Sequence, residues 1–475
     1  MATDIEKLKS DFAAAGQSHV FAFFDEMDGD EKASFLAQLE SVDLNELEKL
    51  NAELVFAHQS AAVDFSALQP APYIALPSSK DSDEEWAAAK KIGEDAIRAG
   101  RLAAFVVAGG QGTRLGFDAP KGLYPVSPIN GKSLFQIFAE KILYASRKYG
   151  VSIPWLVMTS KINDEPTREF FEENKFFGLK REDVIFFTQG LMPAVDKAGK
   201  IILERKSSIA MTPDGHGGCL RAMCRSGAIA ELKKRGVDCI SYFQVDNPLV
   251  DIVDPCFLGF HLLGKSDMSS KMIPKAYAAE KVGHFCMNGD RLAVVEYSDL
   301  PEDYQKQTDA NGCLKFIAGS VAIHIVDVAF VEKMGSGSGA LPFHRADKKI
   351  PFVDADGVLQ KPQSSNGIKF EMFVFDALPM AENPVIIEGL RGDEFSPVKN
   401  AEGVDSPKTC KEDQMRQFAR WLVDAGANLK IDERGLPEAE LEISPLFATN
   451  ATDFKTKWTA LEPTPDLSKP VYIDS

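Results

Sequence analysis

The sequence predicts an α/β fold built on a mostly parallel sheet, and three observations support this prediction. Continuous apolar segments, such as 101–107 and 238–245, alternate with amphipathic ones, such as 133–150. Apolar residues in the amphipathic segments recur at three- and four-residue steps, which is typical of helices that cover a sheet. The apolar segments end in glycine or polar residues, and open α/β sheets bind ligands beyond the carboxyl ends of their strands.

The predicted elements follow one another in a regular order. Most of residues 1–98 are predicted to be helical, because apolar residues recur there at helical spacing. Strands are then predicted at 101–107, 155–160, 183–188 and 238–245, with helices between them at 133–150, 165–178 and 217–236. From about residue 270 the apolar segments shorten, which predicts mixed or antiparallel additions on the substrate side. We therefore expect an N-terminal helical region (1–98), a catalytic domain (99–385) and a small C-terminal domain (386–475).

Composition and charge exclude several classes of protein. The net charge of -17 argues against a general nucleic-acid binder, because phosphate backbones need clustered lysine and arginine. No apolar run reaches the length of about 18 residues that a membrane helix needs, and the first residues do not resemble a secretory signal. The seven cysteines form no CxxC pair, so neither a disulfide framework nor a zinc knuckle is indicated. We expect a cytoplasmic protein without membrane partners, present as a monomer or weak homo-oligomer.

The glycine-rich segment after the first predicted strand matches neither of two known phosphate-binding patterns. The residues Gly131-Lys132-Ser133 could end a Walker A loop only if position 126 were glycine, but it is Val126. The dinucleotide fingerprint would need a third glycine at position 115, which is Leu115. The failed fingerprint disfavours a dinucleotide-dependent oxidoreductase.

The same segment still has the properties of a nucleotide-binding loop. Gly109 and Gly110 let the backbone approach a base or phosphates closely. Arg114 and Lys121 follow them and can neutralise phosphate oxygens, arginine as a planar fork and lysine as a point charge. A strand, a glycine loop and two cations in this order predict a nucleotide site.

The motif AGGQGTRLG, followed by PKG, resembles the signature of the eukaryotic-type UDP-sugar pyrophosphorylases. The resemblance continues in order through FFTQG, PDGHGG, QVDNPLV, VVEYSD, NGIKFEMFVFDALP, LRGDEFSPVKN and EISPL. It spans roughly residues 100–446 and is strongest with the N-acetylglucosamine branch. It implies a Rossmann-like nucleotide-diphospho-sugar transferase core and a Mg²⁺-dependent reaction in which UTP and a hexose 1-phosphate yield a UDP-sugar and pyrophosphate.

The resemblance also implies roles for individual residues. The uridine of UTP is expected to contact Val107, Ala108, Gly109, Gly110, Gln189 and Gly215. The amide of Gln189 can both donate and accept, as the edge of uracil requires. Three cations are expected to neutralise the charge of the phosphates: Arg114, Lys121 and Lys399. Asp246, at the end of an apolar strand, resembles the Mg²⁺ ligand, and Glu296 resembles the carboxylate that accepts hydrogen bonds from sugar hydroxyls.

Two positions depart from the N-acetylglucosamine branch. That branch usually has asparagine where this chain has His216, and GHG is typical of the UDP-glucose and broad-specificity branches. It also tends to have asparagine in an AGN motif, where this chain has Ser320. Both side chains are expected to face the sugar phosphate or the sugar hydroxyls. His216 need not act as a base, because an ionised phosphate attacks without losing a proton.

The preferred interpretation is a uridylyltransferase that uses N-acetylglucosamine 1-phosphate. Two alternatives stay open at this point. One is an enzyme for glucose 1-phosphate or for a broad range of sugar 1-phosphates. The other is a homologue that binds UDP-sugars without turning them over.

Overall fold

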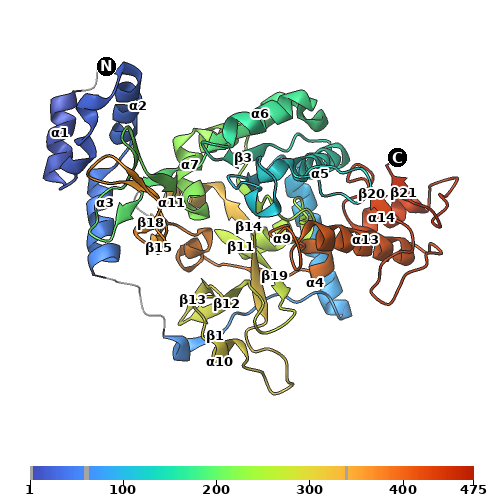
Figure 1. Cartoon of the computed structure of the whole chain (residues 1–475). Coiled ribbons are helices and arrows are strands. Elements are labelled where there is room, and N and C mark those ends of the chain that lie inside the picture. Colours follow the sequence, from blue (N-terminus) through green and yellow to red (C-terminus); the bar gives the residue numbers. More distant parts are fainter. Residues whose placement is uncertain (1–3, 58–63, 337–340, 475) are drawn as a thin grey trace. The chain divides into compact units, whose positions relative to one another are not determined.

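The computed structural model of the chain describes residues 4–57, 64–336 and 341–474 (Figure 1). The chain divides into two compact units, each made of segments far apart in the sequence. The first unit comprises Met1–Asp64, Gln189–Cys219 and Leu341–Asp376, and the second comprises Phe65–Thr188, Leu220–Ala340 and Ala377–Ser475. The boundaries expected near residues 98 and 385 differ from these, and that division into three regions remains a prediction.

The second unit is built on a 10-stranded sheet whose centre is parallel, as the sequence predicts. Its parallel strands are consecutive in the sheet and, in spatial order, are β10 (Cys239–Gln244), β2 (Leu102–Val107), β3 (Trp155–Thr159) and the edge strand β4 (Val184–Thr188). The register places Val107 beside Gln244 on one side and Met158 on the other. The carboxyl ends of these strands therefore lie at one edge of the sheet, where ligands of α/β proteins bind.

Further strands extend this sheet, and most of them pair antiparallel, as the sequence predicts. β14 (Ala318–Asp327) pairs antiparallel with β10 and also with β11 and β12. The remaining strands of the sheet are β1 (Leu68–Pro70), β11 (Met268–Pro274), β12 (Gly283–Asn288), β13 (Arg291–Val295) and β19 (Ile386–Glu388).

Helices connect the parallel strands, with one difference from the predicted set. α5 (Leu134–Tyr149) starts at Ser133, whose side chain accepts a hydrogen bond from the backbone of Gln136. α6 (Asp164–Glu173) follows β3. The segment 217–236, predicted as one helix, forms α7 (Cys219–Arg225) and α8 (Ala228–Lys234). Gly227 adopts φ +83° between them, and this left-handed conformation ends the first helix.

Helix α4 (Lys80–Arg98) belongs to the second unit, although the sequence groups it with the N-terminal helices. It packs closely against α9 (Pro255–Gly264). A Cβ atom on Gly93 would overlap the carbonyl of Pro255, and one on Gly259 would overlap the carbonyl of Ala89. The two glycines thus allow the helix backbones to approach each other.

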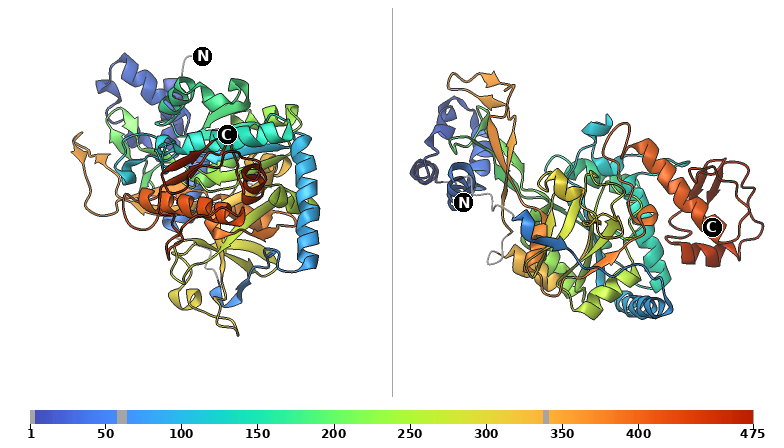
Figure 2. Two further views of the ribbon diagram at one scale, coloured as in Figure 1. Left: turned by 90° about the vertical axis from the view of Figure 1, so that its right-hand side faces the viewer. Right: turned by 90° about the horizontal axis from the view of Figure 1, so that it is seen from below.

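The C-terminal segment of the second unit has a hydrophobic cluster of its own, which includes Trp421, Phe454 and Trp458. Its elements, red in Figure 2, are α13 (Pro407–Asp424), α14 (Ala451–Trp458) and the parallel pair β20 (Leu441–Ile443) and β21 (Val471–Ile473). The other short helices of this unit are α10 (Glu302–Gln305), α11 (Val328–Gly335) and α12 (Arg391–Glu394).

The first unit packs three helices against short strands. The helices are α1 (Ile5–Ala14), α2 (Gly29–Glu40) and α3 (Leu44–Leu50). Its core joins Phe12 and Phe35 from the helices to Val195 and Phe370 from the strands. The strands are β5 (Leu191–Pro193), β6 (Val195–Asp196), β7 (Leu203–Arg205), β8 (Ser208–Ile209), β9 (Met211–Pro213), β15 (His344–Lys348), β16 (Phe352–Val353), β17 (Leu359–Gln360) and β18 (Gly367–Glu371). Strands this short show no clear alternation in sequence, so the pattern of residues does not reveal them.

Among the described residues, no helix combines the length and the apolar character that a membrane span requires. All seven cysteines carry free thiols.

Candidate functional site

The predicted site residues fall into two groups, one in each unit. The second unit contains most of them, beginning with the nucleotide loop after β2. The backbone N–H of Ala108 donates to the carbonyl of Met158 at 2.8 Å, which extends the pairing of β2 with β3 by one residue. A Cβ on Gly112 would lie 2.8 Å from the Phe117 ring, whereas one on Gly110 would meet no atom within 4 Å. Gly112 is therefore needed for the turn, and Gly110 leaves exposed backbone that a ligand can reach.

Asn163 holds the nucleotide loop in place, and the sequence patterns did not identify it. Its side-chain amide donates to the carbonyls of Gly109 at 2.8 Å and Gly110 at 2.9 Å. Its side-chain oxygen accepts a hydrogen bond from the amide of Gln111. Asn163 is fully buried and lies just after β3. A polar residue that follows a buried strand closely is the one signal that could have found it.

Lys121 and Asp246 meet at the carboxyl ends of β2 and β10. Their Nζ and Oδ2 atoms are 3.6 Å apart, and 8% of the Lys121 side chain and 21% of the Asp246 side chain are exposed. The backbone N–H of Lys121 donates to the carbonyl of Gly110, which connects it to the nucleotide loop. The carbonyl of Asp246 accepts a hydrogen bond from the backbone of Val398 at 2.8 Å, so the residue before Lys399 is held at the same edge.

The loop that carries Lys399 is closed by Asp405, which the sequence analysis did not single out. The carbonyl of Asp405 accepts hydrogen bonds from the backbone of Lys399 at 2.7 Å and of Asn400 at 3.0 Å. Its carboxylate lies 3.9 Å from the Lys399 ammonium, and its φ is +55°, a conformation uncommon for a residue with a Cβ. Burial raises the pKa of Asp405 above its ordinary value, Lys399 opposes the rise, and the charge of Asp246 adds to it.

Glu296 and Ser320 lie on either side of one glycine. Ser320 on β14 is paired with Gly283 on β12, and Glu296 follows β13. A Cβ on Gly283 would lie 3.3 Å from Glu296 Oε1, 3.5 Å from Ser320 Cβ and 2.7 Å from Val294. The sheet therefore brings the two predicted sugar-binding residues together, and Gly283 keeps the space between them open. Arg114 lies on the 3-10 turn Thr113–Leu115 of the nucleotide loop with its side chain exposed.

In the first unit, Gln189 and Gly215 are directly connected. The Gln189 side-chain amide donates to the carbonyl of Gly215 at 2.8 Å. Gly215 adopts φ +83°, and a Cβ there would overlap the backbone of Met372. Met372 also accepts a hydrogen bond from Gly217 and donates one to Asp214, both at 2.8 Å. The predicted base-binding residues therefore sit on a loop whose shape depends on glycine.

His216 lies next to this loop in an aromatic environment. Its Nδ1 accepts a hydrogen bond from the backbone of Val374 at 3.2 Å, and its ring centroid lies 5.4 Å from that of Phe373 and 5.8 Å from that of Phe375. Burial lowers the pKa of His216 to about 4. The ring is therefore neutral near pH 7 and, because Nδ1 accepts, its proton is on Nε2. Nε2 of His216 can therefore donate a hydrogen bond.

His344 and Asp376 support the same aromatic residues and were not identified from the sequence. His344 Nε2 is 2.7 Å from Asp376 Oδ2. The His344 ring stacks on Phe373 with the centroids 4.8 Å apart. Phe373 thus contacts the rings of both His216 and His344, an arrangement that local sequence spacing does not indicate.

Comparisons with known proteins show which family the chain belongs to. The family described as UTP–glucose-1-phosphate uridylyltransferase matches residues 50–406. The chain is 38% identical over 463 residues to UDP-N-acetylhexosamine pyrophosphorylase-like protein 1 of Xenopus tropicalis, covering 91% of this chain and 90% of the relative. It is 35% identical over 463 residues to UDP-N-acetylglucosamine diphosphorylase 2 of Arabidopsis thaliana, covering 93% and 88%. Among solved structures, the uridine diphosphate N-acetylglucosamine pyrophosphorylase of Trypanosoma brucei, in complex with inhibitor, gives a TM-score of 0.83 at 27% identity, covering 100% of this chain and 99% of that one.

Proposed function

We propose a substrate pair and a mechanism for this chain, which belongs to the UTP–glucose-1-phosphate uridylyltransferase family. The protein is a UDP-sugar pyrophosphorylase, that is, a uridylyltransferase that joins UTP to a sugar 1-phosphate and releases pyrophosphate. The names of its relatives favour N-acetylglucosamine 1-phosphate as the acceptor over glucose 1-phosphate.

The observation that carries the proposed mechanism is the convergence at the carboxyl edge of the sheet in the second unit. The nucleotide loop, the Lys121–Asp246 pair and the segment that carries Lys399 are joined there by hydrogen bonds and by the 3.6 Å contact between Lys121 and Asp246. Transfer between phosphates depends mainly on positioning and on charge stabilisation, so cations next to an exposed glycine backbone are the groups that the reaction needs.

In this mechanism an oxygen of the sugar 1-phosphate attacks the α-phosphorus of UTP in line, and pyrophosphate leaves on the opposite side. Lys121 is largely buried, and its ammonium offsets the charge that develops on the phosphate oxygens. Lys399 and the exposed Arg114 bind the remaining phosphate oxygens. An already ionised phosphate attacks directly, so no side chain has to remove a proton, and no covalent intermediate with the protein forms.

The residues at this edge are suited to hold Mg²⁺. The Asp246 carboxylate is partly exposed at a strand end, and Asp405 places a second carboxylate near it. Oxygen ligands of this kind are the ones that Mg²⁺ prefers, together with substrate phosphates and water. When bound, the ion would supply positive charge to the phosphates of UTP. We propose Asp246 as its principal protein ligand.

The choice of sugar is proposed to depend on Ser320, Glu296 and His216. Serine is shorter than the asparagine that the family's N-acetylglucosamine branch tends to have, so Ser320 leaves room that a water can fill. Hydrogen-bonded sites discriminate strongly when a bond is lost, but spacious hydrated sites discriminate weakly. We therefore expect an enzyme that uses N-acetylglucosamine 1-phosphate best and glucose 1-phosphate measurably. The seven free thiols are compatible with a reducing compartment, and we propose a cytoplasmic monomer or weak homo-oligomer.

Pyrophosphate release with UTP and a panel of sugar 1-phosphates tests the proposal. We expect the highest kcat/KM for N-acetylglucosamine 1-phosphate, a lower but measurable value for glucose 1-phosphate, and loss of activity when Mg²⁺ is chelated. A kcat/KM for glucose 1-phosphate about a hundredfold above that for the N-acetylated sugar would identify a UDP-glucose enzyme. No turnover with any sugar would instead support an inert UDP-sugar-binding homologue.

A further inference from the structure

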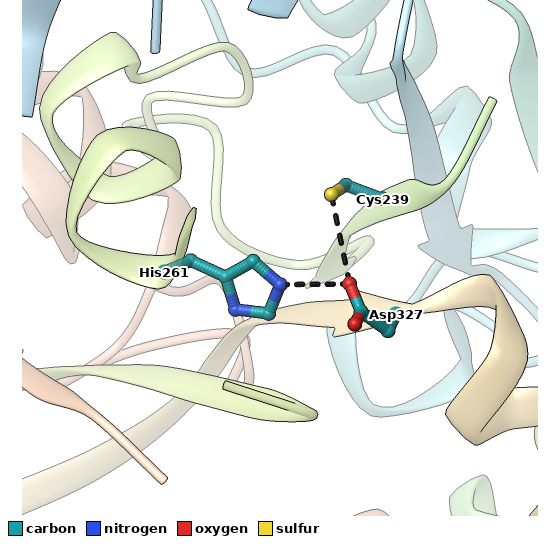
Figure 3. Close-up of side chains that lie close together, drawn as sticks. All are labelled: Cys239, His261 and Asp327. Atoms are coloured by element: carbon teal, nitrogen blue, oxygen red, sulfur yellow. Dashed lines mark hydrogen bonds and ion pairs between the residues drawn. The ribbon is translucent and has the colours of Figure 1, made fainter. Parts of the chain in front are cut away.

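Three side chains with metal-binding atoms meet at the end of the sheet opposite to the proposed nucleotide site. Cys239 is the first residue of β10, His261 lies in α9, and Asp327 is the last residue of β14 (Figure 3). Asp327 is 66 positions from His261 and 88 from Cys239 in the sequence. Spacings this long match no metal-binding motif, so only the fold brings the three together.

The distances between their donor atoms are close to those around a bound transition metal. His261 Nε2 is 3.0 Å and Cys239 Sγ is 3.7 Å from Asp327 Oδ1, and the three atoms lie within 4.8 Å of one another. Zinc binds sulfur at about 2.3 Å and nitrogen at about 2.0 Å, so the donors of one ion lie roughly 3–4 Å apart. A small rearrangement of the side chains would therefore let all three reach one ion.

The second nitrogen of His261 already has the partner that a metal-bound histidine needs. Nδ1 lies 2.8 Å from the hydroxyl of Ser269, which is fully buried. A hydroxyl can either donate to Nδ1 or accept from it. When His261 Nε2 donates to Asp327, Ser269 donates to Nδ1. When Nε2 instead gives its lone pair to a metal, Nδ1–H donates to Ser269, and such a bond orients the ring of a metal-binding histidine.

The charges near the three side chains and their solvent accessibility are also compatible with a bound cation. The nearby Arg101 is paired with Asp238 at 2.8 Å, so its positive charge is largely compensated. Cys239 and His261 are each only 1% exposed, whereas 37% of the Asp327 side chain is exposed. The Asp327 carboxylate is therefore in contact with solvent, from which an ion can reach it.

We propose that Cys239, His261 and Asp327 form a Zn²⁺ site that connects β10, α9 and β14. The sulfur, nitrogen and oxygen donors match the preference of Zn²⁺, and water completes the coordination. On binding, the ion replaces the proton of the Cys239 thiol, which passes to solvent. The site is distinct from Asp246, because Cys239 and Gln244 are at opposite ends of β10, roughly 15–20 Å apart at the rise of a strand.

Titration of the full chain with Co²⁺, a coloured substitute for Zn²⁺, tests the site. We expect a thiolate-to-cobalt charge-transfer band that saturates at one ion per chain and disappears when Zn²⁺ displaces the Co²⁺. Cys239→Ser should abolish the band and lower Zn²⁺ affinity by about 100-fold or more. Cys313→Ser is the matched control, because Cys313 is an exposed cysteine elsewhere, and it should keep the band.

Two further variants keep the test decisive. Asp327→Asn retains a group that can accept the hydrogen bond from His261 but removes the charge, and it should weaken Zn²⁺ binding even if Cys239→Ser does not fold. Asp246→Asn should keep the cobalt band, which separates this site from the proposed Mg²⁺ ligand. Wild-type protein without stoichiometric Zn²⁺ binding in calorimetry, or a band that survives Cys239→Ser, would overturn the proposal.

Discussion

The sheet edge around Lys121 and Asp246 and the loop around His216 differ in how they accommodate charge. The edge keeps ions in contact, with Lys121 3.6 Å from Asp246 and Lys399 3.9 Å from Asp405. In the loop, burial keeps His216 neutral next to Phe373, and Gln189 and His216 each form a hydrogen bond with a backbone group. The edge is therefore suited to stabilise charge that develops during the reaction, and the loop to recognise the shape and hydrogen bonds of a substrate.

This comparison separates two kinds of variant. Changes at the edge should lower turnover, because charge stabilisation is needed most in the transition state. Changes in the loop should alter affinity or selectivity, because uniform binding contributes to KM rather than to kcat.

The largest effect is expected for Asp246→Asn, which removes a charge without changing the shape of the side chain. We expect kcat to fall by about 100- to 1000-fold, the range seen when one electrostatic contact of a reaction site is lost. The fold should survive, because the hydrogen bond from Val398 reaches the backbone of Asp246 and not its side chain. Steady-state kinetics at saturating Mg²⁺ measure kcat, and circular dichroism measures whether the fold survives.

The control for this variant is Glu302→Gln, which removes the same charge from an exposed ion pair with Lys306. Its turnover should equal that of the wild type. Near wild-type turnover of Asp246→Asn itself would mean that the metal ligand lies elsewhere.

Gln189→Ala should act on UTP affinity. Loss of a partly buried polar partner costs about 1–3 kcal/mol, so the KM for UTP should rise roughly tenfold or more. Discrimination between UTP and CTP should weaken at the same time, because the amide is proposed to read the edge of the base. Gln360→Ala, which removes a glutamine that bonds Asp354 elsewhere in the first unit, is the control. Unchanged UTP affinity and unchanged base preference would remove Gln189 from the site.

The burial of His216 predicts how the stability of the fold depends on pH. Burial lowers its pKa to about 4 from 6.5, so the unfolded chain takes up a proton at a higher pH than the folded one. The titration of the buried ring therefore has no effect on the free energy of unfolding above about pH 6.5. As pH falls toward about 4, the free energy of unfolding decreases by up to about 3 kcal/mol for such a shift. His216→Asn should make the melting temperature less dependent on pH in this window.

Thermal unfolding of both proteins between about pH 7 and pH 4 measures the difference, and His284, whose pKa is also lowered to about 4, contributes equally to both. The kcat/KM of the wild type should show no step from His216 near pH 6.5. Parallel stability curves for the two proteins would show that folding leaves the pKa of His216 unchanged.

The smallest effect is expected for Ser320→Asn. Asparagine fills the space beside Gly283 and adds both a donor and an acceptor, so the preference for N-acetylglucosamine 1-phosphate over glucose 1-phosphate should increase several-fold. Competition assays with both sugars measure the ratio, and Ser468→Asn at an exposed position should leave it unchanged. A preference that moves toward glucose 1-phosphate would contradict the proposed role of this position.

The sequence by itself determined the parallel centre of the sheet and the residues at its edge. The buried strands β2, β3 and β10 are continuous apolar segments, and α5 has regular helical spacing, so local periodicity is enough to find them. Because the carboxyl ends of parallel strands meet at one edge, the same pattern places the nucleotide loop near Asp246.

Only the tertiary structure decided how the remaining residues are arranged. Gln189 and His216 lie in a unit that joins the N-terminal helices to residues 341–376, and strands of two to five residues carry no clear period. Asn163, Gly283 and Asp405 act through contacts with loops or neighbouring strands that their own local sequence does not indicate. Side-chain hydrogen bonds and close packing depend on which distant segments come into contact. The whole chain determines these contacts, and no single segment does.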